Sequence, residues 1–556
     1  MPPSSLRVVY AFAREMHPKT SEVFIEYGTA GFRTKANLLE HVVYRMGLLA
    51  VIRSRVLNGR TIGMMITASH NLEPDNGVKL VDPEGEMLME DWEAVATKLA
   101  NVSDNDLEKT VQEIIATKQA DMALKASVFI GMDTRYTSPR LAAAAANGVI
   151  ALKGTPKEFG IVTTPMLHFF VKCRNDNSYG TPTEEGYYEK IVGAFKNMRK
   201  RLPLRGDYNP RLYVDGANGV GGKKLKAIKK NLDELELHLF NLGGLGEKLN
   251  LGCGADHVKV TQSPPKGITH PPYQRVASVD GDGDRIVYYY LDEKQKMFLL
   301  DGDRIATLIA SYIQELMHAC NATDISLGII QTAYANGAST KYITDTLKIP
   351  VQFVKTGVKH LHSAAQTYDI GVYFEANGHG TVLYSPKAKN AIIRISKEGE
   401  AGARKAAELF LDFIDMTNET VGDAISDLFI VESILCARGW SAVQWMELYD
   451  DLPCRLLKVT VKDRGVIRTT DAERICSEPQ GLQDRIQELV VKYPSGRSFV
   501  RPSGTEDIVR VYAEAATREQ ADMLAAEVVQ AAYELAGGVG PRPELPCPAS
   551  DTVAAD

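Results

Sequence analysis

Short apolar runs and longer stretches with helical spacing alternate along the chain. The short runs predict strands at residues 61–66, 127–132, 212–215, 275–279 and 508–513. Apolar positions three or four residues apart predict helices at residues 38–57, 141–152, 304–319 and 401–414. The recurring order of strand, polar or glycine-rich turn and helix indicates an α/β fold.

A serine and a histidine follow the strand predicted at residues 61–66. Ser69 and His70 lie in a segment that is too polar to belong to the core, and Lys79 comes ten positions after Ser69. Loops that a rigid sheet presents often carry nucleophiles. A Ser-His pair alone is more often an ordinary polar turn, so its meaning depends on the rest of the chain.

Three carboxylates alternate with glycines after the strand predicted at residues 275–279. Asp280, Asp282 and Asp284 would repel one another unless a cation lay among them. Hard oxygen ligands suit Mg²⁺, Mn²⁺ or Ca²⁺ better than zinc. An EF-hand would require Gly and Glu where this chain has Arg285 and Leu291, so that type of loop is excluded. A solvated acidic turn is the alternative.

Another turn offers groups that bind phosphate. The sequence Arg501-Pro502-Ser503-Gly504-Thr505 combines hydroxyls with a glycine turn, whose backbone N–H groups can surround an anion. Arg501 and Arg510 can each form paired hydrogen bonds with phosphate oxygens. An ordinary turn is the alternative.

A fourth motif carries groups that pair with sugar hydroxyls. Glu375, Asn377 and His379 lie within five residues, after an apolar run and beside two glycines. Hydroxyls both donate and accept hydrogen bonds, so a carboxylate and an amide pair well with them. Asn377-Gly378 is also a strong turn pair, and a hairpin is therefore the alternative.

The four motifs together, in this order, resemble the α-D-phosphohexomutases, a family with a phosphoserine loop, a metal loop, a sugar loop and a phosphate loop. Residues 28–33, Gly-Thr-Ala-Gly-Phe-Arg, are similar to the family's N-terminal arginine loop. The segments most similar in sequence to the phosphoacetylglucosamine mutase branch are residues 67–71, 75–80, 85–88, 374–380 and 501–507. The resemblance spans most of the chain.

The resemblance implies a four-domain architecture, with three related mixed α/β domains and a smaller C-terminal α+β domain around a central cleft. The domains are expected at residues 1–185 (phosphoserine loop), 186–300 (metal-binding loop), 301–440 (sugar-binding loop) and 441–536 (C-terminal, phosphate-binding). Residues 432–451 resemble a link to the last domain. Residues 537–556 are rich in Pro, Gly and Ala, and we expect them to form a disordered tail.

The same resemblance implies a role for each motif. Ser69 would carry a phosphoryl group, and one Mg²⁺ per chain would be held by Ser69, Asp280, Asp282 and Asp284. Lys79 and His379 are the candidates for the general base, in an order that stays open, and Arg33 would steady the transferring group. Substrate would be bound by Glu375, Ala376, Asn377, Arg501, Pro502, Ser503, Gly504, Thr505 and Arg510.

The resemblance also implies an isomerase that interconverts N-acetylglucosamine 6-phosphate and N-acetylglucosamine 1-phosphate and so feeds UDP-N-acetylglucosamine synthesis. A sugar 1,6-bisphosphate would be both the intermediate and the activator. The residues alone lead only to phosphoryl transfer on a sugar phosphate. A mutase for another hexose phosphate and a metal-dependent sugar phosphatase are the alternatives.

Composition narrows the class of protein further. The chain has 556 residues, enough for several domains, and its 44% hydrophobic and 24% charged content is that of a globular protein. A net charge of −6 argues against nucleic-acid binding. Seven scattered cysteines, no signal peptide and no apolar run of membrane-spanning length predict a cytoplasmic protein. We expect a small sugar phosphate as its partner, no membrane, and a monomer or weak homo-oligomer.

Overall fold

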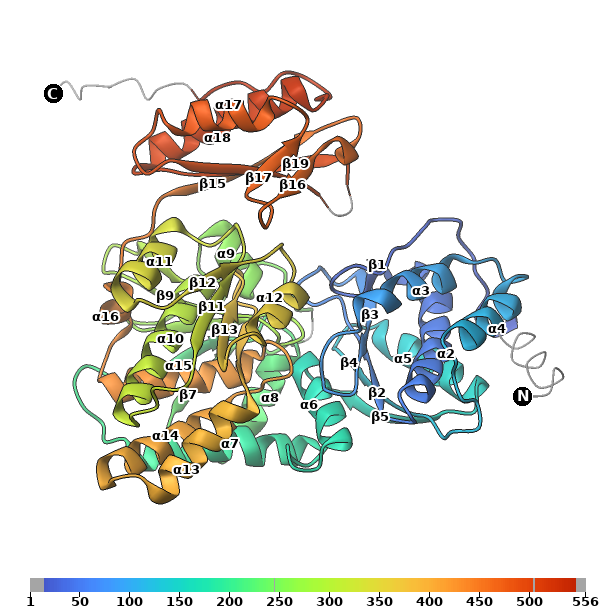
Figure 1. Cartoon of the computed structure of the whole chain (residues 1–556), viewed down its shortest axis with the longest axis horizontal. Coiled ribbons are helices and arrows are strands. Elements are labelled where there is room, and N and C mark those ends of the chain that lie inside the picture. Colours follow the sequence, from blue (N-terminus) through green and yellow to red (C-terminus); the bar gives the residue numbers. More distant parts are fainter. Residues whose placement is uncertain (1–14, 245, 504–505, 547–556) are drawn as a thin grey trace. The chain divides into compact units, whose positions relative to one another are not determined.

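The computed structural model describes residues 15–244, 246–503 and 506–546. The chain divides into two compact units (Figure 1). Unit 1 contains Met1–Ile325 and Asn377–Trp445, and unit 2 contains Ser326–Ala376 and Met446–Asp556. Among the described residues, none of the helices combines the length and apolar character that crossing a membrane requires.

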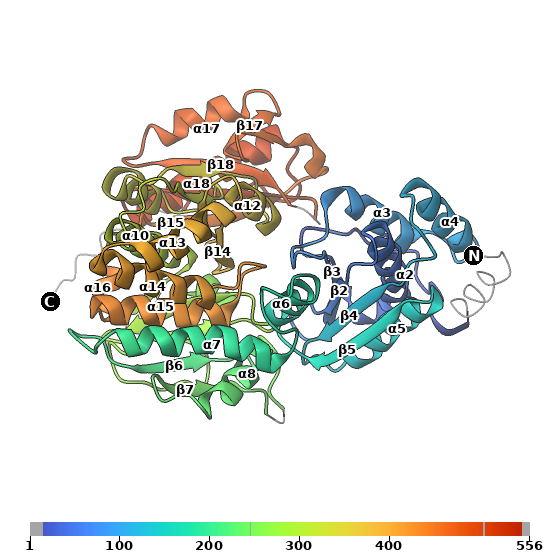
Figure 2. The same ribbon diagram turned by 60° about the horizontal axis from the view of Figure 1, so that its bottom comes forward.

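The first sheet of unit 1 presents the serine segment. Its five strands, in spatial order, are β1 (Phe32–Lys35), β3 (Asp75–Val81), β2 (Ile62–Ile66), β4 (Ser127–Met132) and β5 (Thr155–Ile161). Every residue of β2 is buried, because β3 and β4 flank it and helices pack against the sheet. The helices are α2 (Glu40–Val56), α3 (Glu90–Asn101), α4 (Leu107–Thr117), α5 (Ser138–Ala151) and α6 (Thr164–Asn175), and Figure 2 shows α2 and α5 beside this sheet.

The second sheet of unit 1 presents the three aspartates. Its strands, in spatial order, are β10 (Met297–Leu300), β9 (Ile286–Leu291), β8 (Val276–Val279), β6 (Arg211–Asp215) and β7 (Glu236–Phe240). The aspartates lie in the turn between β8 and β9, which pair antiparallel. The other elements of unit 1 are a short 3₁₀ turn (Ala36–Leu38), α7 (Glu184–Arg201), α8 (Val220–Lys229), α9 (Ala255–Thr261), α10 (Gly302–Ala319), β14 (Gly380–Tyr384), α13 (Pro386–Glu398), α14 (Ala401–Met416) and α15 (Ala424–Arg438). The five-residue α16 (Ala442–Met446) ends where unit 2 resumes.

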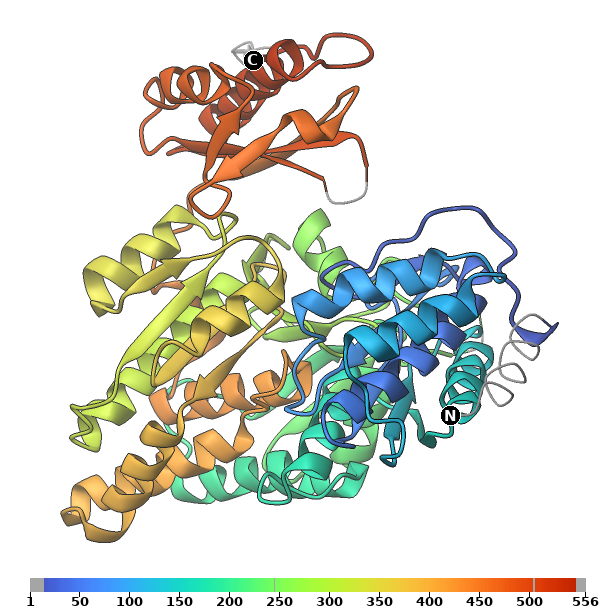
Figure 3. The same ribbon diagram turned by 45° about the vertical axis from the view of Figure 1, so that its right-hand side comes forward.

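Unit 2 contains a parallel and an antiparallel sheet. The parallel part pairs β11 (Leu327–Gln331) with β12 (Val351–Phe353) and β13 (Ile370–Phe374), and includes α11 (Gly337–Lys341), a π-helical turn (Tyr342–Leu347) and α12 (Val358–Ala365). The antiparallel sheet has the order β15 (Cys454–Thr460), β19 (Ile508–Glu514), β18 (Arg497–Pro502). The same C-terminal segment also contains a 3₁₀ turn (Arg464–Val466), the two-stranded ribbon of β16 (Arg468–Thr470) and β17 (Ile475–Glu478), and the helices α17 (Leu482–Val490) and α18 (Arg518–Leu535). Figure 3 shows α17 and α18, in red, on one face of this sheet.

The α/β fold class that the sequence predicts is confirmed, and the predicted helices and strands form with ends shifted by a few residues. The predicted link at residues 432–451 begins too early. Glu432 lies inside α15, which continues to Arg438 because almost all of its residues are buried. The four domain boundaries stay predictions. Of the predicted tail, residues 547–556 lie outside the described part of the chain, and Val539 still donates a backbone hydrogen bond to Thr460.

A buried ion pair connects α15 to the second sheet of unit 1. Glu432 accepts hydrogen bonds from Arg275 Nε at 2.7 Å and Nη2 at 2.5 Å, and from Tyr208 Oη at 2.9 Å. Both charged side chains are almost fully buried. Removing one partner of such a pair leaves an unpaired charge in the interior.

We expect Glu432→Gln to destabilise the protein by about 3 kcal/mol, because it leaves the Arg275 guanidinium buried without its counter-charge. The matched control is Glu236→Gln, which breaks the exposed Arg211–Glu236 pair and should leave stability nearly unchanged. The measurement is the urea midpoint of unfolding. Equal midpoints for the two variants would contradict a stabilising role for the buried pair.

Candidate active site

The serine predicted as a nucleophile lies in a strained turn directly after β2. Ser69 has a φ of +49°, in the left-handed region that residues with a Cβ rarely adopt. Its N–H donates to Thr67 Oγ1 at 2.9 Å, and its Oγ donates to Asp280 Oδ2 at 2.8 Å. His70 Nδ1 lies 3.4 Å from the same Oγ. Burial, followed by the charges of Arg285 and Arg33, lowers the pKa of His70 to about 2, so this ring is neutral.

The expectation that this segment lies outside the core is wrong for Ser69, which is only 1% exposed. The turn is polar in sequence, but the metal loop and the residues around it cover it. A Cβ on Gly281 would lie 2.7 Å from the Ser69 carbonyl oxygen, so the two turns touch through their backbones. The sequence cannot indicate this burial, since the covering residues are about two hundred positions away.

The three aspartates converge in the interior. Their ligand atoms lie within 4.8 Å of one another, and all three side chains are buried. Asp280 Oδ1 also accepts the backbone N–H groups of Gly283, Asp284 and Arg285, at 3.0 to 3.2 Å, and thereby closes the turn. Burial, followed by the charges of the other two aspartates, raises the pKa of Asp280 well above its usual value. Three carboxylates in this position require a cation among them.

The donor set fits a hard divalent cation. Asp282 Oδ2 accepts the hydroxyls of Thr164 at 2.6 Å and Thr67 at 3.3 Å, whereas Asp282 Oδ1 and Asp284 Oδ1 are buried without a hydrogen-bond partner. Carboxylate oxygens of this kind are the ligands that Mg²⁺ prefers. The Ser69 Oγ, which already contacts Asp280, completes the predicted set of ligands.

A lysine and a histidine border the carboxylates. Lys79, on β3, places its Nζ 3.2 Å from Asp284 Oδ2 and 3.6 Å from Asp282 Oδ2. His379 Nδ1 lies 3.5 Å from the other oxygen of Asp284. Burial alone would raise the pKa of Asp284, but the charges of Lys79 and His379 lower it well below its usual value. Burial likewise opposes the charge on Lys79, yet the two carboxylates raise the pKa of this amine.

Arg33, on β1, brings its guanidinium cation to the same region. Its Nη1 donates to Asn71 Oδ1 at 3.3 Å, while its Nε is buried with no hydrogen-bond partner. Burial, followed by the charge of Arg285, lowers the pKa of Arg33, and Asp282 and Asp284 counter this effect. An unsatisfied guanidinium N–H beside the nucleophile suits an anionic group such as a phosphoryl.

The predicted sugar loop extends across the boundary between the two units. Glu375 and Ala376 follow β13 in unit 2 and are half-buried. In unit 1, Asn377 Oδ1 accepts the backbone N–H of His379 at 3.0 Å. Gly378 has a φ of +87°, and a Cβ there would lie 1.9 Å from the Ile286 carbonyl oxygen. Only glycine fits this turn, which fixes His379 beside the end of the metal loop.

The predicted phosphate loop connects β18 to β19 in unit 2. Arg501 and Arg510 are direct cross-strand partners, and Lys458 of β15 is the partner of Arg510 on its other side. Like charges that face one another across strands repel. Arg501 Nε is balanced by Glu473 Oε1 at 3.1 Å. This row of three cations, Arg501, Arg510 and Lys458, suits a bound anion.

The rest of that loop is described in part. Pro502 ends β18, and Ser503 is buried with its N–H donating to the Ile508 carbonyl at 2.8 Å. The predictions for Gly504 and Thr505 fall outside the described residues.

The structure thus brings together Ser69, Asp280, Asp282, Asp284, Lys79, His379 and Arg33 within unit 1. Sequence reasoning missed the threonines that bond Asp282, because a lone Thr carries no signal. It also missed Lys458, whose position opposite Arg510 requires the strand register. Arg135 and Asn250, which bond the backbone around Ser69, were missed too. For Arg135 a signal was present: Asp133-Thr134-Arg135 directly follows the strand predicted at residues 127–132, and loops at strand ends often carry functional residues.

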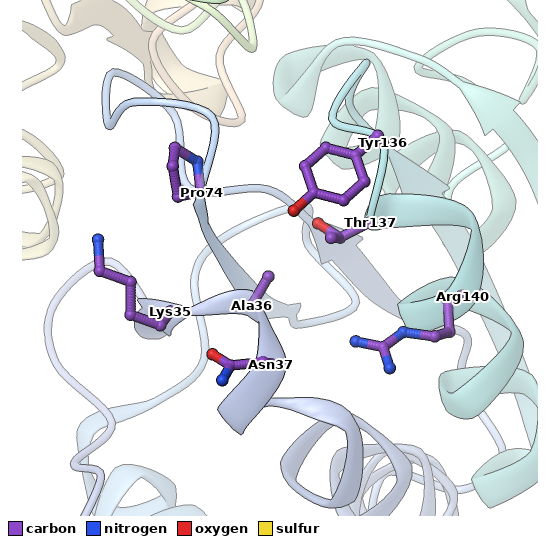
Figure 4. Close-up of a pocket in the computed structure, with 7 residues that line it drawn as sticks. All are labelled: Lys35, Ala36, Asn37, Pro74, Tyr136, Thr137 and Arg140. Atoms are coloured by element: carbon purple, nitrogen blue, oxygen red, sulfur yellow. The ribbon is translucent and has the colours of Figure 1, made fainter.

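A hollow of about 450 Å³ on unit 1 has none of these predicted site residues in its lining (Figure 4). It is lined by Lys35, Ala36, Asn37, Pro74, Tyr136, Thr137 and Arg140. Its two cations are already paired, Lys35 with Asp75 at 2.6 Å and Arg140 with Glu40 at 2.8 Å. The hollow therefore does not alter the assignment of the active site.

Comparison with known protein families gives matches along most of the chain. Two models match by the descriptions "Phosphoacetylglucosamine mutase AMG1, domain II" at residues 177–287 and "domain III" at residues 301–440. Two others match as "Phosphoglucomutase/phosphomannomutase", with the alpha/beta/alpha domain I at residues 90–179 and the C-terminal domain at residues 456–531. These matches confirm the predicted four-domain architecture.

Individual relatives agree with these models. The phosphoacetylglucosamine mutase of Sus scrofa is 51% identical over 530 residues, which are 95% of this chain and 97% of that protein. The structure of Aspergillus fumigatus N-acetylphosphoglucosamine mutase in complex with GlcNAc-6P and magnesium has a TM-score of 0.92 and 45% identity, and covers 96% of this chain and 100% of that chain. A serine-to-alanine form of the same enzyme in complex with glucose 1,6-bisphosphate has a TM-score of 0.91 and 44% identity, and covers 97% and 100%.

We expect Asp282→Asn to weaken Mg²⁺ binding about tenfold or more, because the variant keeps the shape of the side chain and removes one of three converging charges. The measurement is the concentration of Mg²⁺ that half-saturates the rise in melting temperature of chelator-treated protein. Asp292→Asn, in the turn after β9, is the control and should bind Mg²⁺ like the wild type. Unchanged binding by Asp282→Asn would show that the metal site has been misassigned.

Proposed function

Because this chain belongs to the phosphoacetylglucosamine mutases of the α-D-phosphohexomutase superfamily, we propose that it interconverts N-acetylglucosamine 6-phosphate and N-acetylglucosamine 1-phosphate. The observation that carries this proposal is the hydrogen bond from Ser69 Oγ to Asp280, one of three buried carboxylates that converge. A buried serine beside a cation site can accept and return a phosphoryl group, as the reaction requires.

The working form carries a phosphoryl group on Ser69. A hydroxyl of the bound sugar phosphate attacks the phosphorus, so that a new oxygen–phosphorus bond forms while the bond to Ser69 Oγ breaks. The hydroxyl proton passes to whichever of Lys79 and His379 is uncharged when the hydroxyl attacks, since both side chains flank Asp284 and only the uncharged form can accept a proton. Arg33 holds the transferring group through its unsatisfied Nε. Mg²⁺, when bound by Ser69 and the three aspartates, withdraws charge from the phosphoryl oxygens.

The first half-reaction leaves a sugar 1,6-bisphosphate, and the second returns its other phosphate to Ser69. The sugar must therefore present each of its two ends to Ser69 in turn. The phosphate that is not reacting would be bound by Arg501, Arg510, Lys458, Ser503 and the loop that contains Gly504 and Thr505. Glu375, Ala376 and Asn377 would contact the sugar hydroxyls, whose donors and acceptors match a carboxylate and an amide.

A small sugar phosphate is the partner that this chemistry requires. We also propose that the chain acts without nucleic acid, in keeping with its net charge of −6, without a membrane, and as a monomer or weak homo-oligomer.

A metal-dependent phosphatase is the rival function, since it would use the same serine and cation. The distinction is the fate of the phosphate. Following N-acetylglucosamine 6-phosphate by phosphorus NMR, we expect the 1-phosphate to accumulate far faster than inorganic phosphate. Dephosphorylated protein should recover activity on addition of glucose 1,6-bisphosphate. Inorganic phosphate released as fast as product, with no response to the bisphosphate, would favour the phosphatase.

Ser69→Ala should abolish nearly all turnover, because it removes the hydroxyl that carries the phosphoryl group in the proposed mechanism. Intact-mass analysis should find one phosphate on the phosphorylated wild type and none on the variant. Ser103→Ala, which alters an exposed serine that bonds Asp106, is the control and should retain wild-type activity. Substantial mutase activity in Ser69→Ala would exclude the covalent mechanism.

Arg510→Ala should raise KM about tenfold to a hundredfold, since a charge-assisted hydrogen bond to phosphate contributes roughly 1.5–3 kcal/mol. Lys458→Ala should act in the same direction with a smaller effect, because Lys458 contributes a point charge and no paired hydrogen bonds. Arg485→Ala, on the exposed side of α17, is the control in the same unit. A KM for Arg510→Ala equal to that of the control would show that the cation row does not bind the substrate.

A further inference from the structure

A single buried guanidinium holds the backbone of the nucleophile turn. Arg135 follows β4, and its side chain is fully enclosed. Its Nε donates to Asp133 Oδ2 at 2.9 Å. The other four N–H groups donate to main-chain carbonyls of one turn, those of Ser69 (3.0 Å), Asn71 (2.8 Å), Leu72 (2.7 Å) and Asp75 (2.9 Å). All five donors of the guanidinium are therefore used, four of them on the segment that carries Ser69.

The amide of Asn250 reaches the same turn from the region between β7 and α9. Its Nδ2 donates to the Ser69 carbonyl at 2.9 Å and to the Asn71 carbonyl at 3.0 Å. The metal loop lies against this amide, because a Cβ on Gly281 would be 2.8 Å from Asn250 Nδ2. The nucleophile turn, Asn250 and the metal loop thus form one close contact within unit 1.

These hydrogen bonds act on a conformation that is otherwise unfavourable. Ser69 has a positive φ and is buried, and its carbonyl would lose both of its side-chain donors without Arg135 and Asn250. Strained backbone at a functional residue persists only when its surroundings enforce it. Two side chains from different segments of unit 1, Arg135 and Asn250, supply that constraint here.

We infer that Arg135 and Asn250 are positioning residues for phosphoryl transfer. Arg135 sets the shape of the nucleophile turn, and Asn250 fixes its spacing from the aspartates. Neither side chain touches the reacting atoms, so both act through the backbone of Ser69. The inference rests on the proposed function, in which Ser69 gives and regains a phosphoryl group in every cycle. The Ser69 side chain must occupy the same position in each cycle, since a displacement of about 1 Å can lower a rate about a hundredfold.

The decisive variant is Asn250→Gly, because glycine keeps the φ of +58° found at this position and deletes only the amide. The matched control is Asn218→Gly. Asn218 has a φ of +56° and donates its Nδ2 to a backbone carbonyl, that of Lys248 at 3.1 Å, outside the nucleophile turn. We expect Asn250→Gly to lower kcat about tenfold with little change in KM, and to hasten loss of phosphate from Ser69 to water. The control should match the wild type in all three.

A readout that needs no substrate separates this inference from the proposed function. Hydrogen exchange at residues 67–76 should be faster in Asn250→Gly and in Arg135→Lys than in the wild type and the control. If the wild type isomerises no sugar phosphate, the proposed function fails, while exchange still reports on the hydrogen bonds to the turn. If Arg135→Lys does not fold, Asn250→Gly decides. Exchange, kcat and phosphoserine lifetime all equal to those of Asn218→Gly would overturn the inference.

Discussion

Three carboxylates buried within one short turn are the constraint on which the rest of the site depends. Negative charges this close in the interior are tolerated only with compensation from cations and hydrogen-bond donors. The chain supplies Lys79 from β3, His379 from the turn after β13 and hydroxyls from two threonines, yet Asp282 Oδ1 remains buried without a hydrogen-bond partner. The nucleophile, Ser69, donates a hydrogen bond to Asp280, one of the three. The turn is therefore built around a divalent cation, and Ser69 is held where that cation can act on it.

The two units carry different parts of the proposed chemistry. Unit 1 contains the nucleophile, the carboxylates and the cations next to them, so the geometry of phosphoryl transfer depends on one compact body. Unit 2 contains the cation row on β15, β19 and β18. This division suits the proposed reaction, in which the groups that transfer the phosphoryl stay in place while the sugar presents first one end and then the other.

Site residues could be predicted from the sequence where the groups that act together are close together in the chain. Asp280 to Asp284 converge because alternating glycines permit a tight turn, and the aspartates are contiguous enough to be recognised from the printed chain. Ser69 follows a strand whose apolar run is plain, so its position could also be predicted. The family resemblance added the roles of Lys79, Arg33 and His379, and the structure places all three beside the carboxylates.

Site residues could not be predicted from the sequence where their contacts join segments that are far apart in the chain. Asn250 reaches the Ser69 carbonyl across 181 positions, and an amide in a loop has no pattern that indicates such a contact. The burial of Ser69 was missed for the same reason, since its cover comes from elsewhere in the chain. Lys458 is one of many exposed lysines until the strand register places it beside Arg510.

The most direct test of this account is a single-turnover transfer from the protein to the sugar. Protein carrying a radiolabelled phosphoryl group on Ser69 would be mixed with excess unlabelled N-acetylglucosamine 6-phosphate, with Mg²⁺ or with chelator, and the label would be followed on protein, sugar and inorganic phosphate. We expect the label to move to sugar phosphates within one turnover when Mg²⁺ is present and to stay on the protein when Mg²⁺ is chelated. Label that appears as inorganic phosphate, or that moves to sugar equally well without Mg²⁺, would contradict this expectation.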